Sequence, residues 1–388
     1  MHAEIPAETR FVASTVQPEP DVGQMETLAA RDLDWGQVVQ EAVNRHGVGP
    51  LLYRNLTASG FDELVPEQVV ERLHQHSRGT ATRNLSLTNS LLSLLEHLDE
   101  AGIWALPYKG PVLSESIYAD FSLRRFRDLD ILVRPNDLHD AEAVLVERGF
   151  EPKRELTENQ KQLLMTNGRQ RTMEKGGILV ELHPRISTPD PPFEVATLFE
   201  RAGSVDLAGD SIPAIEPADN LLVLSVHGTR HRWNQLKWIC DIAYMIRNET
   251  VNWPVVLDES KRRNCYRRLL LGCGLASAVL DVELPDIVHF RANDTVPRLI
   301  SDTYPYCLLG IDDTTSLRYR LRSRDDTVNR IRYCWNKLTH PSVQEADNIQ
   351  VPDQFFGVNY LFQPVRVTCS KLISVALELV SKIRVNTK

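Results

Sequence analysis

The sequence predicts an α+β protein in which a small mixed sheet with flanking helices lies between a helical N-terminal region and an α-helical C-terminal domain. Apolar residues recur three and four positions apart over residues 25–101 and again after residue 216, as on one face of a helix. Residues 102–215 instead contain short apolar runs separated by turn residues, which is typical of strands joined by helices. The 388 residues are enough for at least two hydrophobic cores.

The composition narrows the possible partners. Hydrophobic residues make up 42% of the chain, charged residues 25%, and the net charge of −8 makes DNA an unlikely partner. No apolar run reaches the roughly 18 residues of a membrane helix and no secretory signal is visible, so we expect a cytoplasmic protein with no membrane contact. The six cysteines include no CxxC pair, which disfavours a zinc ribbon or a disulfide framework.

Four regions are expected along the chain. The first residues are rich in Pro, Glu and Thr without periodicity, which indicates a loose leader. The final segment, within residues 351–383, predicts one more amphipathic helix. The expected regions are a leader at 1–24, a helical N-terminal region at 25–101, an α/β core at 102–215 and an α-helical C-terminal domain at 216–388.

The α/β core alternates short strands and helices. The order begins with a strand in "IWALPYKG", a short helix in "PVLSESIYA", a strand in "DLDILV" and a capped helix in "NDLHDAEAVLVERGF" that ends at Gly149. We then expect a short strand at "EPKRE", a helix over residues 158–166, and a hairpin, "RTMEKGGILVELH", that turns at Gly176 and Gly177.

Two aspartates stand at the start of the strand "DLDILV". Because successive side chains of a strand point to opposite faces, Asp128 and Asp130 share one face. The other face carries Leu129, Ile131 and Val133 and is expected to face the core. Two carboxylates about 4 Å apart repel by about 4 kcal/mol at an effective dielectric constant of about 20, so the pair needs a compensating cation. Mg²⁺, bound by carboxylates and substrate phosphates, is the natural choice and favours nucleotide chemistry.

Two further features fit a phosphate and metal site. The same alternation in "ILVELH" places the isolated acid Glu181, with His183, on the face opposite the core. Gly110 allows a phosphate to approach the backbone, Pro111 suits the first turn of a helix whose N-terminus attracts anions, and Lys109 adds a positive charge. Alone, a D-x-D is usually a solvated strand end and a Lys-Gly-Pro an ordinary turn; their joint order is much less expected by chance.

The order of these motifs resembles the nucleotidyltransferase superfamily with the DNA polymerase β-like fold. More closely, the chain is similar to bacterial nucleotidyltransferase family proteins that are often labelled uncharacterised. The likeness covers most of the chain from about Val48 to the late "YLFQPVR". The stretches that carry it are "YKGPVLSESIY", "RDLDILV" before a helix ending "LVERGF", "VELH", and "LLVLSVHGTRHRWNQLKWICDIAYMI".

The resemblance implies a site and a reaction. Asp128 and Asp130 would bind metal, and Glu181 would help to bind metal or activate the acceptor. Two Mg²⁺ ions, replaceable by Mn²⁺, would bind an NTP, ATP by default. A hydroxyl or phosphate of a small molecule, peptide or protein would then attack its α-phosphorus and release pyrophosphate. The residues implied in nucleotide binding are Lys109, Gly110, Arg127, Arg230, His231 and Lys237. Lys-Gly stands where the superfamily usually has Gly-Ser, so Lys109 replaces the serine hydroxyl or the nucleotide binds differently.

The stretch "HGTRHRWNQLKW" places His227 and His231 on one helix face. Gly228 stands where the zinc motif H-E-x-x-H has its general base, which disfavours a zinc protease. The two histidines either pack between helices or belong to a basic rim that contacts phosphates or the acceptor. Lys237 and Asp241 could equally form a surface ion pair of little energetic weight.

Two other functions stay open at this stage. One is a catalytically degenerate module that binds a nucleotide or a protein partner, which the intact Asp128, Asp130 and Glu181 disfavour. The other is a metal-dependent phosphohydrolase, for which the only adjacent His-Asp pair, His139 and Asp140, stands in the first turn of an expected helix. The sequence assigns no role to His183, His227 or Asp241, and it does not identify the acceptor.

Overall fold

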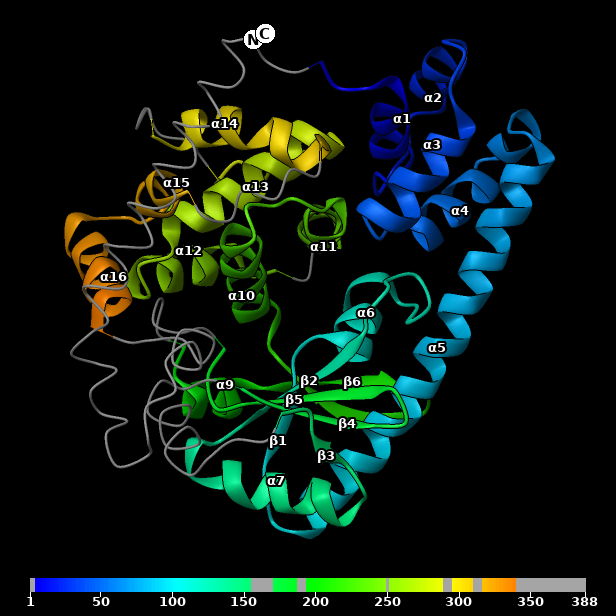
Figure 1. Ribbon diagram of the computed structural model, residues 1–388. Coiled ribbons are helices and arrows are strands. Elements are labelled where there is room, and N and C mark those ends of the chain that lie inside the picture. The colour runs from blue at the N-terminus through cyan, green and yellow to red at the C-terminus, as the bar shows by residue number, and fades with distance from the viewer. Residues whose placement is uncertain are drawn as a thin grey trace, which may run out of the picture.

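The predicted α+β fold is confirmed by the computed structural model, which describes residues 4–154, 170–186, 193–248, 251–288, 295–309 and 316–339. A small sheet lies between helices on both faces, and the long helix α5 (Glu67–Glu100) runs along one side of the molecule (Figure 1). The helices of the C-terminal half lie above the sheet in this view, and α7 (Leu138–Glu147) lies below it.

The loose leader expected over residues 1–24 is wrong for residues 7–16, which are packed in the structure. Helix α1 spans Ala7–Thr15, and Phe11 and Val12 are fully buried. The ring of Phe11 contacts those of Trp35 and Phe61, with ring centroids 5.3 and 5.7 Å away. Burial of the consecutive residues Phe11, Val12 and Ala13 offsets the entropy cost of ordering this segment. The prediction of a loose leader rested on the overall composition, in which these three residues carry little weight.

Short helices complete the N-terminal region before α5. Asp21 and Asp34 cap two of them, each accepting a hydrogen bond of 3.1 Å from the backbone N–H three residues later. The elements are α2 (Val22–Ala29), α3 (Trp35–Gln40), the π-helix η1 (Glu41–Arg45), α4 (Gly49–Ala58) and the 3₁₀ helix η2 (Phe61–Leu64).

The main sheet has the strand order β1-β2-β5-β4-β3. Its strands are β1 (Ala105–Pro107), β2 (Asp128–Val133), β3 (Glu151–Pro152), β4 (Arg171–Lys175) and β5 (Ile178–His183). Strands β2 and β5 are parallel and the other pairs are antiparallel, so the sheet is mixed. The predicted hairpin is confirmed: β4 and β5 are antiparallel, and Gly176 and Gly177 have φ of 55° and 79°. The helix expected over residues 158–166 lies outside the described residues.

The two faces of the sheet contribute to different cores. Leu129, Ile131 and Val133 of β2 are buried in one core together with leucines of α5 and α7, as the alternation predicts. Leu132, on the face of Asp128 and Asp130, belongs to the larger core, to which α6 (Gly110–Tyr118) and the C-terminal helices contribute. The aspartates therefore lie on the face that the helical half of the molecule covers.

A second, two-stranded sheet, β6 (Gly203–Leu207) and β7 (Asp210–Ala214), was not predicted. The remaining elements are η3 (Pro135–Asp137), α9 (Val195–Arg201), α10 (Pro217–Arg230), α11 (Leu236–Arg247), α12 (Trp253–Arg262), α13 (Tyr266–Leu280), α14 (Thr295–Leu309), α15 (Leu317–Arg322) and α16 (Thr327–Thr339). The helix expected within 351–383 lies outside the described residues. Within the described ranges, no helix is long and apolar enough to span a membrane.

Helices α10 and α13 pack around the indole of Trp233, which is fully buried. A Cβ built on Gly228 would lie 2.4 Å from the indole ring, and one built on Gly272 would lie 3.0 Å from it. Glycine at position 228 is therefore explained by this close approach.

Substitution of Gly228 tests this packing. Gly228→Ala is expected to lower the free energy of unfolding by about 1–3 kcal/mol, because the added methyl group overpacks the core against Trp233. Urea unfolding followed by circular dichroism measures the loss. The matched control is Gly79→Ala in the exposed middle of α5, where no atom lies within 4 Å of the new Cβ and helix propensity favours alanine. Equal effects of the two substitutions would contradict the packing argument.

Candidate functional site

The carboxylates meet where β2 and β5 run parallel. Asp130 stands opposite Glu181 in the strand register, and Asp128 stands opposite Leu179. Side chains at paired positions of neighbouring strands lie on the same face, so Asp130 and Glu181 project together. The structure thus brings Asp130 of one strand beside Glu181 of the other, as the alternation predicts, while Asp128 lies one pair further along the same face and outside the group of ligand atoms within 4.8 Å of one another.

His183 joins this group, although the sequence assigned it no role. Its Nε2 lies 2.9 Å from Asp130 Oδ1 and 3.3 Å from Glu181 Oε2. Ligand atoms of Asp130, Glu181 and His183 all lie within 4.8 Å of one another, close enough to share one metal ion. His183 lies two residues after Glu181 and so on the same strand face, which is the sequence signal for its position.

Asp130 is almost fully buried, at 5% exposure, and it is compensated within the protein. Lys109 Nζ donates a hydrogen bond of 3.1 Å to Asp130 Oδ1, and Tyr108 Oη donates one of 3.5 Å to the same oxygen. Burial alone would raise the pKa of Asp130, but Lys109 and His183 outweigh it and hold that pKa far below its usual range. Asp130 therefore keeps its negative charge further into the acid range than an ordinary aspartate does.

Asp128 has a different environment. It is partly buried, and within the described residues its carboxylate has no hydrogen-bond or ion-pair partner. Burial, followed by the charges of Asp130 and Glu181, raises its pKa, while Lys109 and Lys237 act in the opposite direction. Three carboxylates with an uncompensated member suit a divalent cation, since Mg²⁺ and Mn²⁺ prefer oxygen ligands.

The strand-helix turn next to these acids has the conformation that the sequence requires. Gly110 opens α6 with φ of 60°, a value that favours glycine, and Pro111 occupies the first turn. Lys109 immediately precedes the helix, so its side chain and the free N–H groups of the first turn belong to one anion-attracting unit.

The end of α10 and the start of α11 contribute positive charge opposite the carboxylates. Lys237 influences the pKa of Asp128, and Arg230 influences the pKa of Tyr108, so both charges act within the site. Burial, followed by the charge of Arg124, lowers the pKa of Lys237 to about 8. Arg127 is exposed and directly precedes Asp128.

His227 and His231 pack against each other and against Trp238. The two imidazole centroids lie 4.7 Å apart, and they lie 5.5 and 5.0 Å from the indole ring. Burial and then nearby positive charges lower the pKa of His231 to about 4 and that of His227 well below its usual range. Both rings are neutral at pH 7. The positive charge at the end of α10 and the start of α11, called the basic wall below, therefore comes from Arg230 and Lys237.

The sequence matches a family model described as "Uncharacterised nucleotidyltransferase" over residues 31–281, well over half of the chain. The chain belongs to this nucleotidyltransferase family. No curated protein gives a significant match to the sequence.

Two solved structures of nucleotidyltransferases are similar to this family member at low identity. The antibiotic-resistance factor ANT(2'')-Ia is 14% identical, with a TM-score of 0.35 over 46% of this chain and 94% of its own. An antigenic nucleotidyltransferase-like protein from Paracoccidioides brasiliensis is 15% identical, with a TM-score of 0.31 over 53% of this chain and 96% of its own.

Asp241 of this nucleotidyltransferase is not part of a surface ion pair with Lys237. It is fully buried in α11, where Arg124 donates Nε to Oδ1 at 2.9 Å and Nη2 to Oδ2 at 3.0 Å. Tyr118 Oη donates a third hydrogen bond of 3.0 Å. Tyr118 ends α6 and Arg124 lies just before β2, so Asp241 ties the helical half to the segment between α6 and the strand of the aspartates. Sequence reasoning missed this because the partners are 117 and 123 residues apart.

Substitution of Asp241 measures this connection. Asp241→Asn leaves the buried Arg124 guanidinium without a countercharge, so we expect unfolding in urea to require about 3–5 kcal/mol less free energy. Asp258→Asn is the matched control, because Asp258 pairs with Arg262 where the side chains are 68% and 66% exposed. That change should cost less than about 1 kcal/mol. Similar losses in both variants would show that the buried pair is not a special constraint.

Proposed function

We propose that this nucleotidyltransferase family member is a divalent-metal-dependent enzyme that transfers a nucleoside monophosphate from an NTP, ATP in the first instance, to an acceptor. The acceptor would present a hydroxyl or phosphate group on a small molecule or a peptide, and pyrophosphate would be released. The observation that carries the proposal is the carboxylate group, in which Asp130 and Glu181 are in register on parallel strands with the unpaired Asp128 beside them.

Asp128, Asp130 and Glu181 are the residues that would hold the metal, Mg²⁺ or Mn²⁺. When bound, the metal would neutralise phosphate charge and stabilise both the attacking and the leaving oxygen. His183 contacts both Asp130 and Glu181 and so orients the two carboxylates relative to each other. The contacts of His183 with these acids outweigh its burial and raise the pKa of its imidazole.

Positive groups on two sides of the carboxylates would bind the triphosphate. Lys109 and the backbone N–H groups that follow Gly110 face it from the start of α6. The groups on the other side are Arg127, Arg230, His231 and Lys237, of which His231 would act as a neutral hydrogen-bonding group.

The chemical step requires an acceptor oxygen in line with the α-phosphorus. Its attack forms the new P–O bond, and the bond from the α-phosphorus to the bridging oxygen breaks with its electron pair on pyrophosphate. The acceptor proton would pass to Glu181, the least buried of the three grouped side chains Asp130, Glu181 and His183. Asp130, already bonded to Lys109, is the poorer base because its pKa is held far down.

Calorimetric titration of ATP, GTP, CTP and UTP, each with Mg²⁺, tests the proposal. The wild type should bind one nucleotide saturably only when metal is present. Asp128→Asn/Asp130→Asn should lose at least about tenfold in affinity, because two metal-binding charges disappear. Asp140→Asn/Asp258→Asn removes two exposed carboxylates elsewhere and should bind like the wild type. Metal-independent binding that survives loss of both aspartates, without pyrophosphate release, would instead identify a degenerate binding module.

A pH experiment tests the proposed role of Lys237. Its pKa is lowered from 10.5 to about 8, so the side chain is charged below pH 8 and progressively neutral above it. A bound triphosphate favours the charged form, so nucleotide binding at pH 8 should take up about half a proton. Titration in two buffers of different ionisation enthalpy measures this uptake. Lys237→Met should abolish this proton uptake, whereas Lys261→Met, at an exposed position, should leave it unchanged. Unchanged proton uptake in Lys237→Met would show that Lys237 does not contact the triphosphate.

A further inference from the structure

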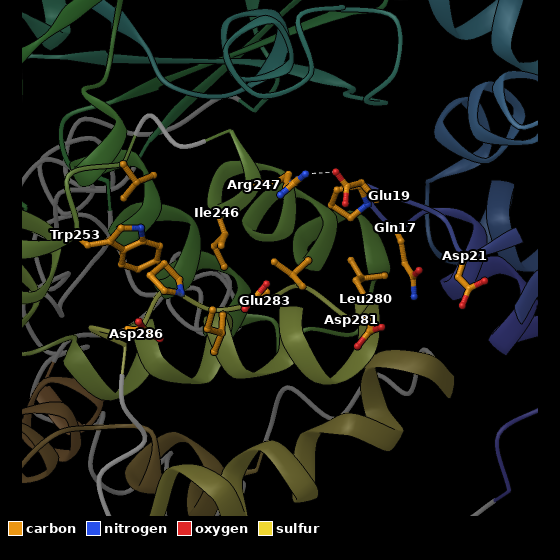
Figure 2. Close-up of a pocket in the computed structure, with 15 residues that line it drawn as sticks. Gln17, Glu19, Asp21, Ile246, Arg247, Trp253, Leu280, Asp281, Glu283 and Asp286 are labelled. Carbon is orange, nitrogen blue, oxygen red and sulfur yellow. Dashed lines mark hydrogen bonds and ion pairs between the residues drawn. The ribbon is translucent and has the colours of Figure 1, made fainter. Parts of the chain in front are cut away.

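A cavity lies away from the carboxylates, between the segment that joins α1 to α2 and the C-terminal ends of α11 and α13 (Figure 2). Its volume is about 680 Å³, within the range of about 300–1,000 Å³ typical of small-ligand sites. Lys237 lies in the first turn of α11 near the carboxylates, and Ile246 lies in its last turn at the cavity. At 1.5 Å per residue, the two positions lie about 14 Å apart along the helix axis.

The cavity has an apolar floor with one aromatic ring. The buried side chains in it are Ile246, Val251, Leu280 and Val282. Trp253 is partly exposed and presents its indole at one end of the cavity, next to the loop that follows α13 (Figure 2). The ring packs partly against the core and keeps an exposed part that lines the cavity, and within the described residues no cationic side chain stacks on it.

The rim of the cavity is acidic. Its carboxylates, all exposed, are Glu19, Asp21, Asp281, Glu283 and Asp286. Arg247, the one cation of the rim, is already paired with Glu19 (Figure 2). Asp21 accepts the capping hydrogen bond of α2. For Asp281, Glu283 and Asp286, no cationic partner is present in the described part of the chain.

Gln17 supplies an independent sign of a ligand. The residue is only 6% exposed, yet it lines the cavity, and its side-chain amide has no hydrogen-bond partner among the residues the structure describes. Its backbone carbonyl is fixed by Asn55 Nδ2 at 3.0 Å and by Tyr244 Oη at 3.2 Å. The side chain points toward the C-terminal end of α13, near Leu280 (Figure 2). The amide of this largely buried residue is therefore open only toward the cavity, where a bound polar group could exchange for water as its hydrogen-bond partner.

We propose that this cavity binds a small organic cation, an ammonium or guanidinium group carried on an apolar body. The apolar body would cover the floor, and the cation would lie between the Trp253 ring and the carboxylates of Glu283 and Asp286. Gln17 would hydrogen-bond a polar group at the other end. An anion is repelled by the rim, and a neutral apolar molecule leaves both the amide and the carboxylates unused. The site does not depend on nucleotidyl transfer.

Two matched ligands test the charge requirement on the full-length protein. Tryptamine and indole-3-propionate share an indole body and differ in the sign of the charge on the side chain. Isothermal titration should show saturable binding of tryptamine, with indole-3-propionate at least about tenfold weaker. Equal binding of the two compounds, or no saturable binding of tryptamine, would overturn the proposal.

Variants locate the binding site. Glu283→Gln/Asp286→Asn should weaken tryptamine binding about fivefold or more, since each carboxylate contributes a partly solvated ion pair. Gln17→Leu should also weaken binding of tryptamine, because it removes the amide that hydrogen-bonds the ligand. Asp62→Asn/Glu63→Gln, which changes two acids of η2 outside the cavity, should bind as the wild type does. Unchanged affinity in the Glu283/Asp286 variant, with a thermal midpoint equal to that of the wild type, would refute the assignment.

Discussion

The buried ion pair between Arg124 and Asp241 is the constraint on which the arrangement of the site depends. Both ends of the segment between α6 and β2 are tied to one carboxylate of α11, through Tyr118 at the start and Arg124 near the end. That segment connects α6 to the strand of the aspartates, while the pairing of β1 with β2 and the bond from Tyr108 N–H to the Asp130 carbonyl place Lys109 beside Asp130. A buried charge pair with bidentate geometry is stable only when both partners remain in place, because loss of one leaves the other charge uncompensated in the interior. The contact between Arg124 and Asp241 therefore favours the arrangement in which α11 lies against this segment.

Helix α11 transmits this constraint in both directions. Its first turn brings Lys237 to the carboxylates, and Tyr244, two turns on, bonds Arg54 at 2.7 Å and the backbone of Gln17 at 3.2 Å. The N-terminal region is thereby joined to the same helix that positions the basic wall. This explains why α1, which composition suggests is loose, is packed: it lies against helices that are themselves held by α11.

Much of the site could be predicted because its signals are local. The alternation in β2 and β5 determines which side chains share a face, and Gly110 and Pro111 mark the start of α6. Neither signal depends on the rest of the fold. The features that were missed depend on distant partners. The buried setting of Asp241 needs Arg124, and the packing of α1 needs Trp35 and Phe61, none of which periodicity can reveal. The role of His183 lay within reach, since it shares the face of Glu181, but a lone histidine in a strand carries no specific signal.

The contact between Lys109 and Asp130 has a consequence for the order in which ligands would bind. The Lys109 ammonium bonds Oδ1 of Asp130, the same oxygen that approaches His183, so a metal that uses this oxygen must compete with a charge-assisted hydrogen bond of 3.1 Å. When a free metal ion displaces Lys109 from Asp130, the ammonium is left without a partner, so the displacement costs free energy. A triphosphate that arrives with the metal offers Lys109 new anionic oxygens at the start of α6, so the displacement costs little. In the proposed reaction, this charge arrangement would favour the metal–nucleotide complex over either component alone, which is the selectivity that nucleotidyl transfer requires.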